Sequence, residues 1–215
     1  MNEPIILFET PQFAALNKPC GLVVERDKHG YPSVEEWAAG RWPFAGIVHR
    51  LDRPVSGLLI IAKKRSALKN LNRQFEARTV EKVYLAIVEA PPPSPSGTLE
   101  HWIGKDQKNK RAVVMPADAP GAFPARLDYL LLGASGDGLS LLEVRPHSGK
   151  FHQIRVQLSA VGCPIAGDEK YGAARSYMPE GIALHAWKLR LEDPASGEPL
   201  SLEAPRPDHP FWKNF

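Results

Sequence analysis

The stretch that organises this chain is His49-Arg50-Leu51-Asp52-Arg53-Pro54-Val55-Ser56-Gly57-Leu58, a turn that carries a carboxylate between two arginines. An apolar run, 58–62, follows directly and ends at two lysines. A short apolar run with such boundaries predicts a strand that is buried on both faces. The turn should therefore lie at one end of a sheet. We expect Asp52 to be ionised there between Arg50 and Arg53, because nearby positive charge favours the charged form of a carboxyl group.

Two interpretations of Asp52 follow from this spacing. An ionised carboxylate on a fixed turn could serve as a nucleophile or a base. Alternatively, Asp52 only stabilises its turn and pairs with an arginine at the surface, which is the commoner use of aspartate in turns. The residues alone favour the second interpretation.

The rest of the chain predicts one α+β domain. Its 215 residues, 43% hydrophobic and 24% charged, suffice for one large core, and its 21 prolines favour interrupted strands over a helical bundle. The regular strand and helix alternation of a parallel sheet is not present in the pattern. Strands are expected at 5–8, 13–16, 58–62, 83–88, 127–132, 139–144, 183–191 and 200–203.

Three amphipathic helices are expected, and for each of them a capping residue marks one end. Ser33 and Glu36 have the spacing of a capping box, which predicts a helix at 34–39. Ser66 can cap a second helix. A third is expected from Phe151 onward, with Gly162 at the position of a C-terminal cap.

Charge and cysteine usage narrow the class of protein. The net charge of +3 is weak, but residues 63–82 hold seven basic side chains against two acidic ones, and a second basic cluster, 105–111, is expected in a polar loop. Such clusters are typical either of a phosphate-binding surface or of a solvated helix face. Cys20 and Cys163 belong to no metal or disulfide pattern, and no apolar run reaches membrane-spanning length, so a reduced cytoplasmic compartment is expected.

Six segments occur in a fixed order: Asn17-Lys18-Pro19-Cys20-Gly21, 49–59, Lys82-Val83-Tyr84, Ser148-Gly149-Lys150-Phe151-His152-Gln153-Ile154-Arg155, 162–168 and Leu184-His185-Ala186. Together they resemble the motifs of the RluA-type pseudouridine synthases. Three departures are visible: Val55 and Ser148 stand where that family usually has Thr, and Lys150 where it has Arg. The loss of the planar guanidinium should make any anchor at Lys150 less rigid.

The resemblance implies a fold and an activity. It implies the pseudouridine synthase catalytic fold, a mixed and largely antiparallel bisected sheet with flanking helices and a central active-site cleft. Residues 1–215 would form a single catalytic domain without an S4 domain. The implied activity is the isomerisation of uridine to pseudouridine in ribosomal or transfer RNA, after the base is flipped from its stack, by a monomer that uses no cofactor and no metal.

The resemblance also implies roles for individual residues. Asp52 would be the essential carboxylate, Arg155 its ion-pair partner, and Tyr84 the residue that contacts the uracil ring and acts as the base. Tyr84 could instead be a tyrosine packed in the core, and Lys18 a solvated turn residue or an RNA contact. The expected RNA contacts are Arg50, His49, Lys63, Lys64, Arg73, Lys82, Lys150 and His152. Arg50 could instead pair with a neighbouring acid. His185, which alternates with apolar residues, is expected in the core or at its rim.

Two other classes of function compete with an RNA isomerase. The chain could be an RNA-binding or RNA-remodelling protein that keeps the fold while its activity is dispensable. It could also be a hydrolase that uses Asp52 with a second carboxylate, as glycoside hydrolases do. No second acid recurs at a matching turn, which argues against the hydrolase.

Overall fold

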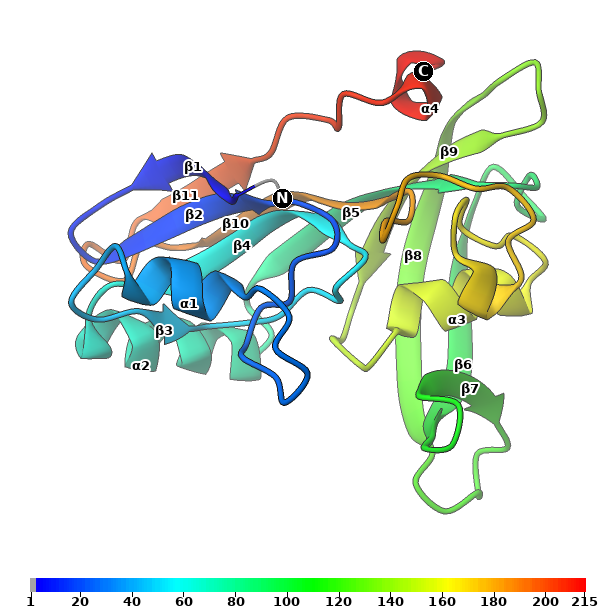
Figure 1. Ribbon diagram of the computed structural model, residues 1–215. Coiled ribbons are helices and arrows are strands. Elements are labelled where there is room, and N and C mark those ends of the chain that lie inside the picture. Colours follow the sequence, from blue (N-terminus) through cyan, green and yellow to red (C-terminus); the bar gives the residue numbers. More distant parts are fainter. Residues whose placement is uncertain (1–2) are drawn as a thin grey trace. The chain divides into compact units, whose positions relative to one another are not determined.

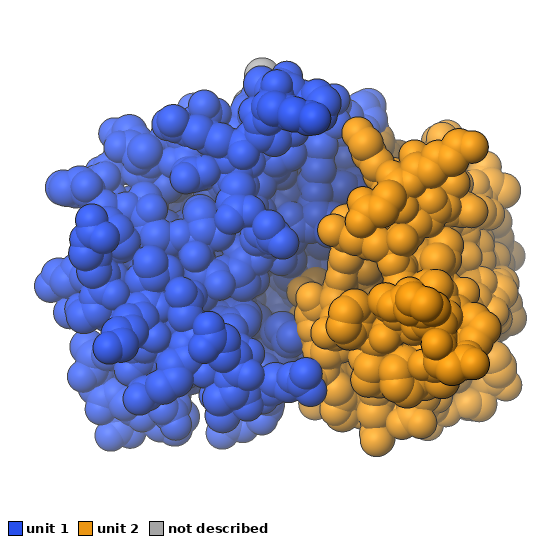
Figure 2. Space-filling model, turned by 90° about the horizontal axis from the view of Figure 1, so that it is seen from below, with its two compact units in different colours: residues 1–82, 179–181, 185–206 blue, residues 83–178, 182–184, 207–215 orange. Residues whose placement is uncertain are grey.

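The computed structural model describes residues 3–215, which form two compact units. Of the described residues, unit 1 comprises 3–82, 179–181 and 185–206, and unit 2 comprises 83–178, 182–184 and 207–215 (Figure 2). Each unit has strands and few helices, which confirms the α+β class. Within residues 3–215, no helix combines the length and the apolar composition that crossing a membrane requires.

The sheet of unit 1 is built around β4 (Ser56–Ala62), the strand predicted from the apolar run. All seven of its residues are buried, as a strand covered on both faces requires. Its neighbour β10 runs parallel to it, whereas the other pairs are antiparallel, so the sheet is mixed. The order is β1 (Ile5–Glu9), β2 (Phe13–Lys18), β4, β10 (Leu184–Glu192), with β3 (Gly46–Ile47) on β4 and β11 (Pro199–Glu203) on β10.

Two helices lie on the same side of this sheet (Figure 1). The helix α1 (Val34–Ala39) has the predicted bounds, and the Ser33 hydroxyl oxygen accepts the backbone N–H of Glu36 at 3.1 Å. The helix α2 (Arg65–Glu76) starts earlier than predicted, with Lys64 as its N-cap residue. The choice of Ser66 as the cap was therefore wrong. The Lys64 N-cap makes no side-chain capping hydrogen bond, and Ala67 and Leu71 are buried, so this helix is stabilised by packing rather than by a side-chain cap.

The sheet of unit 2 is antiparallel throughout. Figure 1 shows α3 (Gln153–Ala160) lying across its strands. The remaining helical segments are a short 3-10 turn, η1 (Glu169–Tyr171), and α4 (Pro210–Lys213). The strand order is β5 (Glu81–Val88), β9 (Ser140–Pro146), β8 (Phe123–Ala134), β6 (Ser96–Asp106) and β7 (Arg111–Met115).

Two predictions in this unit need correction. The basic cluster at 105–111 is only partly a polar loop, because Lys105 lies within β6 and Arg111 opens β7, whereas Lys108 and Lys110 lie in the turn that joins these strands. The helix expected from Phe151 starts at Gln153 instead, because His152 has a left-handed backbone (φ 52°) that a helix cannot include. Gly162, at φ 78°, follows the C-cap as predicted.

Candidate active site

The turn that carries Asp52 is tied to the segment around Gly21. The carbonyl of Asp52 accepts the N–H of Val55 at 3.0 Å, which closes the turn. Gly21 and Arg53 then bind each other twice: the Gly21 N–H donates to the Arg53 carbonyl at 2.9 Å, and the Arg53 Nε donates to the Gly21 carbonyl at 3.0 Å. The half-exposed Asp52 side chain is thus carried by a fixed backbone.

Lys18 lies beneath this turn and is fully buried, with 0% of its surface exposed. Its Nζ donates to the carbonyls of Pro19 at 2.9 Å, Leu22 at 2.8 Å and Arg53 at 3.3 Å. Burial lowers the pKa of Lys18 to about 8, and the charges of Cys20 and Asp52 oppose that shift. Both earlier interpretations of Lys18, a solvated turn residue and an RNA contact, are therefore wrong.

The two arginines beside Asp52 bind other carboxylates. Arg50 is exposed and pairs with Glu25 at 2.7 Å, which is the alternative considered for it. Arg53 pairs with Glu180, and its guanidinium carbon lies 3.9 Å from the centroid of the Tyr31 ring. Both arginines therefore have carboxylate partners of their own, and their effect on Asp52 stays a prediction.

Two histidines of unit 1 support the same turn from inside. The Nε2 of His49 accepts the N–H of Ile60 at 3.1 Å, and its ring stacks on Phe75 with 4.7 Å between the centroids. Burial, and then the charge of Lys82, lower the pKa of His49 to about 3. His185 is 1% exposed, and its Nδ1 lies 2.8 Å from the Ser56 hydroxyl. Burial lowers the pKa of His185 to about 4, in keeping with the core position expected.

Gly57 brings β4 against β10 and has a backbone that side chains rarely adopt (φ 111°). It pairs with Ala186 in the parallel register. A Cβ atom at position 57 would overlap the carbonyl oxygen and the backbone nitrogen of Ala186. The close approach of the two strands beside the Asp52 turn therefore requires glycine.

Unit 2 holds the other two residues to which catalytic roles were assigned. Tyr84 lies on β5, paired with Val144 of β9, and is half-buried. Arg155 lies on α3 with 5% of its surface exposed. Its Nε and Nη2 donate to the two carboxylate oxygens of Asp168, at 2.7 and 2.8 Å. This two-point pairing fixes the plane of the guanidinium.

Asp168 is the partner of a candidate site residue that the sequence analysis did not single out. It is 1% exposed and is the acid that Arg155 binds inside unit 2. Asp168 is the last residue of 162–168, one of the segments that carry the family resemblance, and this position was the one signal in the sequence that pointed to it. A buried arginine needs a buried partner, so a search for acids near α3 could have found it.

Tyr171 connects Arg155 to His152. The Tyr171 ring centroid lies 5.0 Å from the Arg155 guanidinium carbon. The Tyr171 hydroxyl accepts the N–H of Ala112 at 2.7 Å and lies 2.8 Å from the Nδ1 of His152, to which it can donate its proton. Burial, followed by the charges of Arg155, Lys170 and Lys105, lowers the pKa of His152 to about 3. The imidazole of His152 is therefore neutral.

The remaining residues expected to contact RNA differ in accessibility. Lys64 and Arg73 are exposed on α2, whereas Lys63 binds Glu9 at 2.6 Å and the Thr10 carbonyl at 2.8 Å, with 17% of its side chain exposed. The half-buried Lys82 has its pKa lowered, first by burial and then by the charge of Arg78. Lys150 lies with its Nζ 4.7 Å from the Phe123 ring centroid.

The structure assigns the expected catalytic residues to different units. Asp52 belongs to unit 1, and Tyr84 and Arg155 belong to unit 2. Their joint action therefore stays a prediction. Across residues 3–215, no group of three or more His, Cys, Asp or Glu side chains is placed to hold a metal ion.

Comparison with known proteins yields one family. A family model described as RNA pseudouridylate synthase matches residues 12–160. An uncharacterized RNA pseudouridine synthase of Chloroflexus aurantiacus is 40% identical over 89% of this chain and 62% of its own length. The ribosomal large subunit pseudouridine synthase D of Neisseria meningitidis is 33% identical over 94% of this chain and 58% of its own length. The chain thus spans roughly three fifths of these relatives.

Two solved structures share the fold over nearly the whole chain. Human RNA pseudouridylate synthase domain containing 1 superimposes with a TM-score of 0.82 at 27% identity, covering 97% of this chain and 86% of its own. Human RNA pseudouridylate synthase domain containing 4 gives a TM-score of 0.77 at 25% identity, covering 94% and 88%. These likenesses confirm the fold that the sequence motifs implied.

Proposed function

Because the chain belongs to the RNA pseudouridylate synthase family, we propose that it is an RNA pseudouridine synthase that converts uridine in a structured RNA into pseudouridine. The observation that carries the proposal is the extent of the family match. Residues 12–160 include Asp52, Tyr84 and Arg155, the three residues to which the resemblance assigns chemistry.

The proposed reaction rearranges one nucleotide with its atoms conserved. The bond from ribose C1′ to uracil N1 breaks, a bond from C1′ to C5 forms, C5 loses its proton and N1 gains one. Asp52 is the essential carboxylate, and the fixed turn beneath it supports such a role. Tyr84 offers a ring face and a hydroxyl, and serves as the contact to uracil and the acceptor of the C5 proton. Arg155 pairs with Asp52 and keeps it ionised.

The substrate uridine must leave its stack before it reacts, which costs a few kcal/mol. Exposed cations can offset this cost by binding phosphates, and Arg50, Lys64 and Arg73 are the exposed ones among the expected RNA contacts. Lys63, Lys82 and Lys150 are less accessible. His49 and His152 can contribute contacts but no charge near pH 7, because burial keeps their pKa near 3.

Ribosomal RNA is the first substrate to test, and transfer RNA the second. Relatives from Neisseria meningitidis and Vibrio cholerae carry names that refer to the large ribosomal subunit. We further propose that the protein acts in the cytoplasm as a monomer, with no cofactor and no metal.

The experiment deletes the gene in its own host and maps pseudouridine across ribosomal and transfer RNA. The strain is then complemented with wild type, with Asp52→Asn, and with Asp118→Asn, which changes an exposed aspartate of unit 2 as a matched control. We expect at least one uridine to lose its modification, and wild type and Asp118→Asn, but not Asp52→Asn, to restore it.

Other outcomes identify the competing functions. If no site changes in the deletion strain, the isomerase proposal fails and an RNA-binding protein with dispensable activity becomes the better description. Release of free uracil by the purified protein from RNA would identify a hydrolase instead. RNA binding that Asp52→Asn retains while pseudouridine is lost supports catalysis.

A further inference from the structure

Unit 2 exposes two phenylalanine rings close to two lysines. Phe123, at the start of β8, is 53% exposed, and Phe151, just before α3, is 39% exposed. The Nζ of Lys150 lies 4.7 Å from the centroid of the Phe123 ring, and the Nζ of Lys105 lies 4.8 Å from that of Phe151. Each exposed ring thus has an ammonium group beside it. We call Lys105, Phe123, Lys150 and Phe151 together the cation–aromatic surface.

The pairing of the strands shows why these four residues meet. Phe123 on β8 is the register partner of Ile103 on β6, so the two side chains lie on the same face. Lys105 follows Ile103 by two residues and shares that face. Lys150 and Phe151 reach it from the loop that leads into α3, the helix that contacts β6 and β7.

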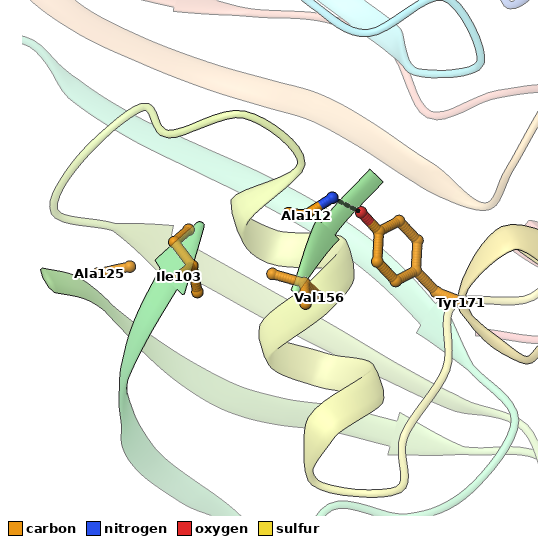
Figure 3. Packing of buried hydrophobic residues seen from close by; sticks show 5 residues of the cluster. All are labelled: Ile103, Ala112, Ala125, Val156 and Tyr171. Atoms are coloured by element: carbon orange, nitrogen blue, oxygen red, sulfur yellow. Dashed lines mark hydrogen bonds between the residues drawn. The ribbon is translucent and has the colours of Figure 1, made fainter. Parts of the chain in front are cut away.

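The layer beneath the surface is packed and hydrogen bonded. Figure 3 shows Val156 of α3 against Ile103 and Ala125, with the Tyr171 hydroxyl bonded to the backbone of Ala112. The rings are therefore carried by a rigid base rather than by an isolated loop. A rigid exposed ring loses little freedom when a ligand stacks on it, which favours binding.

We propose that the cation–aromatic surface binds unpaired nucleotides of the RNA substrate. The inference rests on the proposed function and deepens it. Bases stack on the exposed rings, and phosphates bind the neighbouring ammonium groups, which is how proteins hold single-stranded nucleic acid. A duplex hides the faces of its bases, so it could use the lysines but not the rings.

The charge around the surface suits a polyanion. Residues 105–111, where β6 turns into β7, carry Lys105, Lys108, Lys110 and Arg111, and the one acid of this segment, Asp106, lies 3.7 Å from Arg111 and is bonded by Asn109. A partner with negative charge and flat rings therefore matches both features of the surface.

The surface also connects to Arg155 through stacked rings. The centroid of Phe151 lies 3.8 Å from that of His152, whose Nδ1 bonds the hydroxyl of Tyr171. The Tyr171 ring in turn packs on the Arg155 guanidinium. Nucleotides on the surface would thus lie close to a residue with a proposed catalytic role. This continuity favours the RNA substrate over an unrelated protein as the occupant.

The test uses a Phe123→Ala/Phe151→Ala double variant and a single-stranded oligouridine probe. Its matched control is Leu130→Ala/Leu132→Ala, which removes two exposed side chains (45% and 42%) from β8 of the same unit. We expect the phenylalanine variant to bind the probe at least tenfold more weakly, because it has lost both rings on which bases would stack. Its affinity for a duplex of equal length should match that of the control.

Two further variants separate stacking from a structural effect. Phe123→Tyr/Phe151→Tyr keeps both rings and should keep the affinity of wild type. For Lys105→Gln/Lys150→Gln, the plot of log binding constant against log salt concentration should become less steep, by about one to two released counterions. With the substrate RNA identified by the pseudouridine maps, the alanine variant should raise KM and leave kcat unchanged.

The outcomes distinguish this inference from the proposed function. If wild type forms pseudouridine and the alanine variant binds single strands as well as the control does, the surface proposal is overturned while the enzyme remains. If the alanine variant loses only a protein partner, the proposal is overturned in favour of a protein-docking surface. If wild type forms no pseudouridine yet the alanine variant loses single-strand affinity, the surface stands and the enzyme proposal fails.

Discussion

At the scale of single residues, Lys18 shows how a charged group can serve as an internal support. The ammonium group of Lys18 donates hydrogen bonds to three carbonyl oxygens in place of water, and these bonds join the segment around Gly21 to the Asp52 turn. The local pattern suggests an ordinary turn lysine, because it does not reveal that the Arg53 carbonyl meets the carbonyls of Pro19 and Leu22 around Lys18. Tertiary packing alone supplies that information.

Lys18 should make stability increase with pH over an alkaline range. The pKa of Lys18 in the folded protein, about 8, lies below the ordinary value of 10.5. Between these two pH values the unfolded chain binds more protons than the folded one, so the contribution of Lys18 to the free energy of unfolding increases as pH rises. We expect the free energy of unfolding of wild type, relative to Lys18→Met, to grow by on the order of 3 kcal/mol between pH 7.5 and 10.5.

Urea denaturation at several pH values measures this difference. Lys64→Met, which changes an exposed lysine, serves as the control and should show no such trend. A difference between wild type and Lys18→Met that stays constant with pH would contradict the assignment of a lowered pKa to Lys18.

The pair formed by Arg155 and Asp168 should be essential for the stability of unit 2. Asp168→Asn removes the charged member of a buried ion pair that Arg155 binds at two points, which costs roughly 3–5 kcal/mol of the free energy of unfolding. Asp208→Asn removes the partner of Lys213 at an exposed site and should leave that free energy nearly unchanged. Thermal and urea unfolding compare the two, and equal effects would be evidence against a structural role for the buried pair.

At the scale of elements, the local pattern succeeded wherever burial and spacing agreed. The strand at 58–62 and the helix at 34–39 were predicted because an apolar run and a capping box each have one dominant interpretation. The hairpin of β6 and β7 was missed, because its lysines suggested a loop while its buried residues, Ile103 and Ala112, are widely spaced. Such strands are specified by their partners more than by their own composition.

The two serines that were proposed as helix caps provide a matched test. Ser33 caps α1, so Ser33→Ala should lower the free energy of unfolding by about 1 kcal/mol. Ser66 lies exposed inside the first turn of α2, where no cap is needed, so Ser66→Ala should be neutral or slightly stabilising because alanine favours helices. Chemical denaturation of both variants checks the order, and a larger loss for Ser66→Ala would contradict it.

At the scale of the whole molecule, three histidines are held in the neutral form, His185 in the core and His49 and His152 at half-buried positions. The pKa of His185 is lowered to about 4, and those of His49 and His152 to about 3, from an ordinary value of 6.5. Below pH 6.5 these histidines therefore bind protons in the unfolded chain but not in the folded one, so the free energy of unfolding decreases as pH falls.

We expect the free energy of unfolding to decrease between pH 6.5 and 5, before most carboxylates titrate. The buried His185 alone should contribute roughly 1 kcal/mol per pH unit over much of that interval. Urea denaturation at pH 6.5, 6 and 5 measures the loss, and NMR of the imidazole nitrogens at pH 5 should show these three rings still neutral. Protonation of all three at pH 5 without a change of fold would refute the assignment.

The candidate site was only partly accessible from sequence. Resemblance singled out Asp52, Tyr84 and Arg155, each of which lies in a quoted motif. It did not supply the supports around them: Lys18 under one turn, Asp168 beside Arg155, or the Tyr171 hydroxyl between His152 and Ala112. Those contacts join residues that are distant in the chain, and no spacing rule encodes them.

Gly57 has a consequence for how the gene can vary. The backbone of Ala186 fills the space where any side chain at position 57 would begin, and the positive φ adds strain for every residue other than glycine. Every missense change in that codon introduces a Cβ atom, so any single replacement of Gly57 disrupts the present register of β4 and β10. In a library of all point variants, the functional clones should therefore all encode glycine at position 57, by any of its synonymous codons.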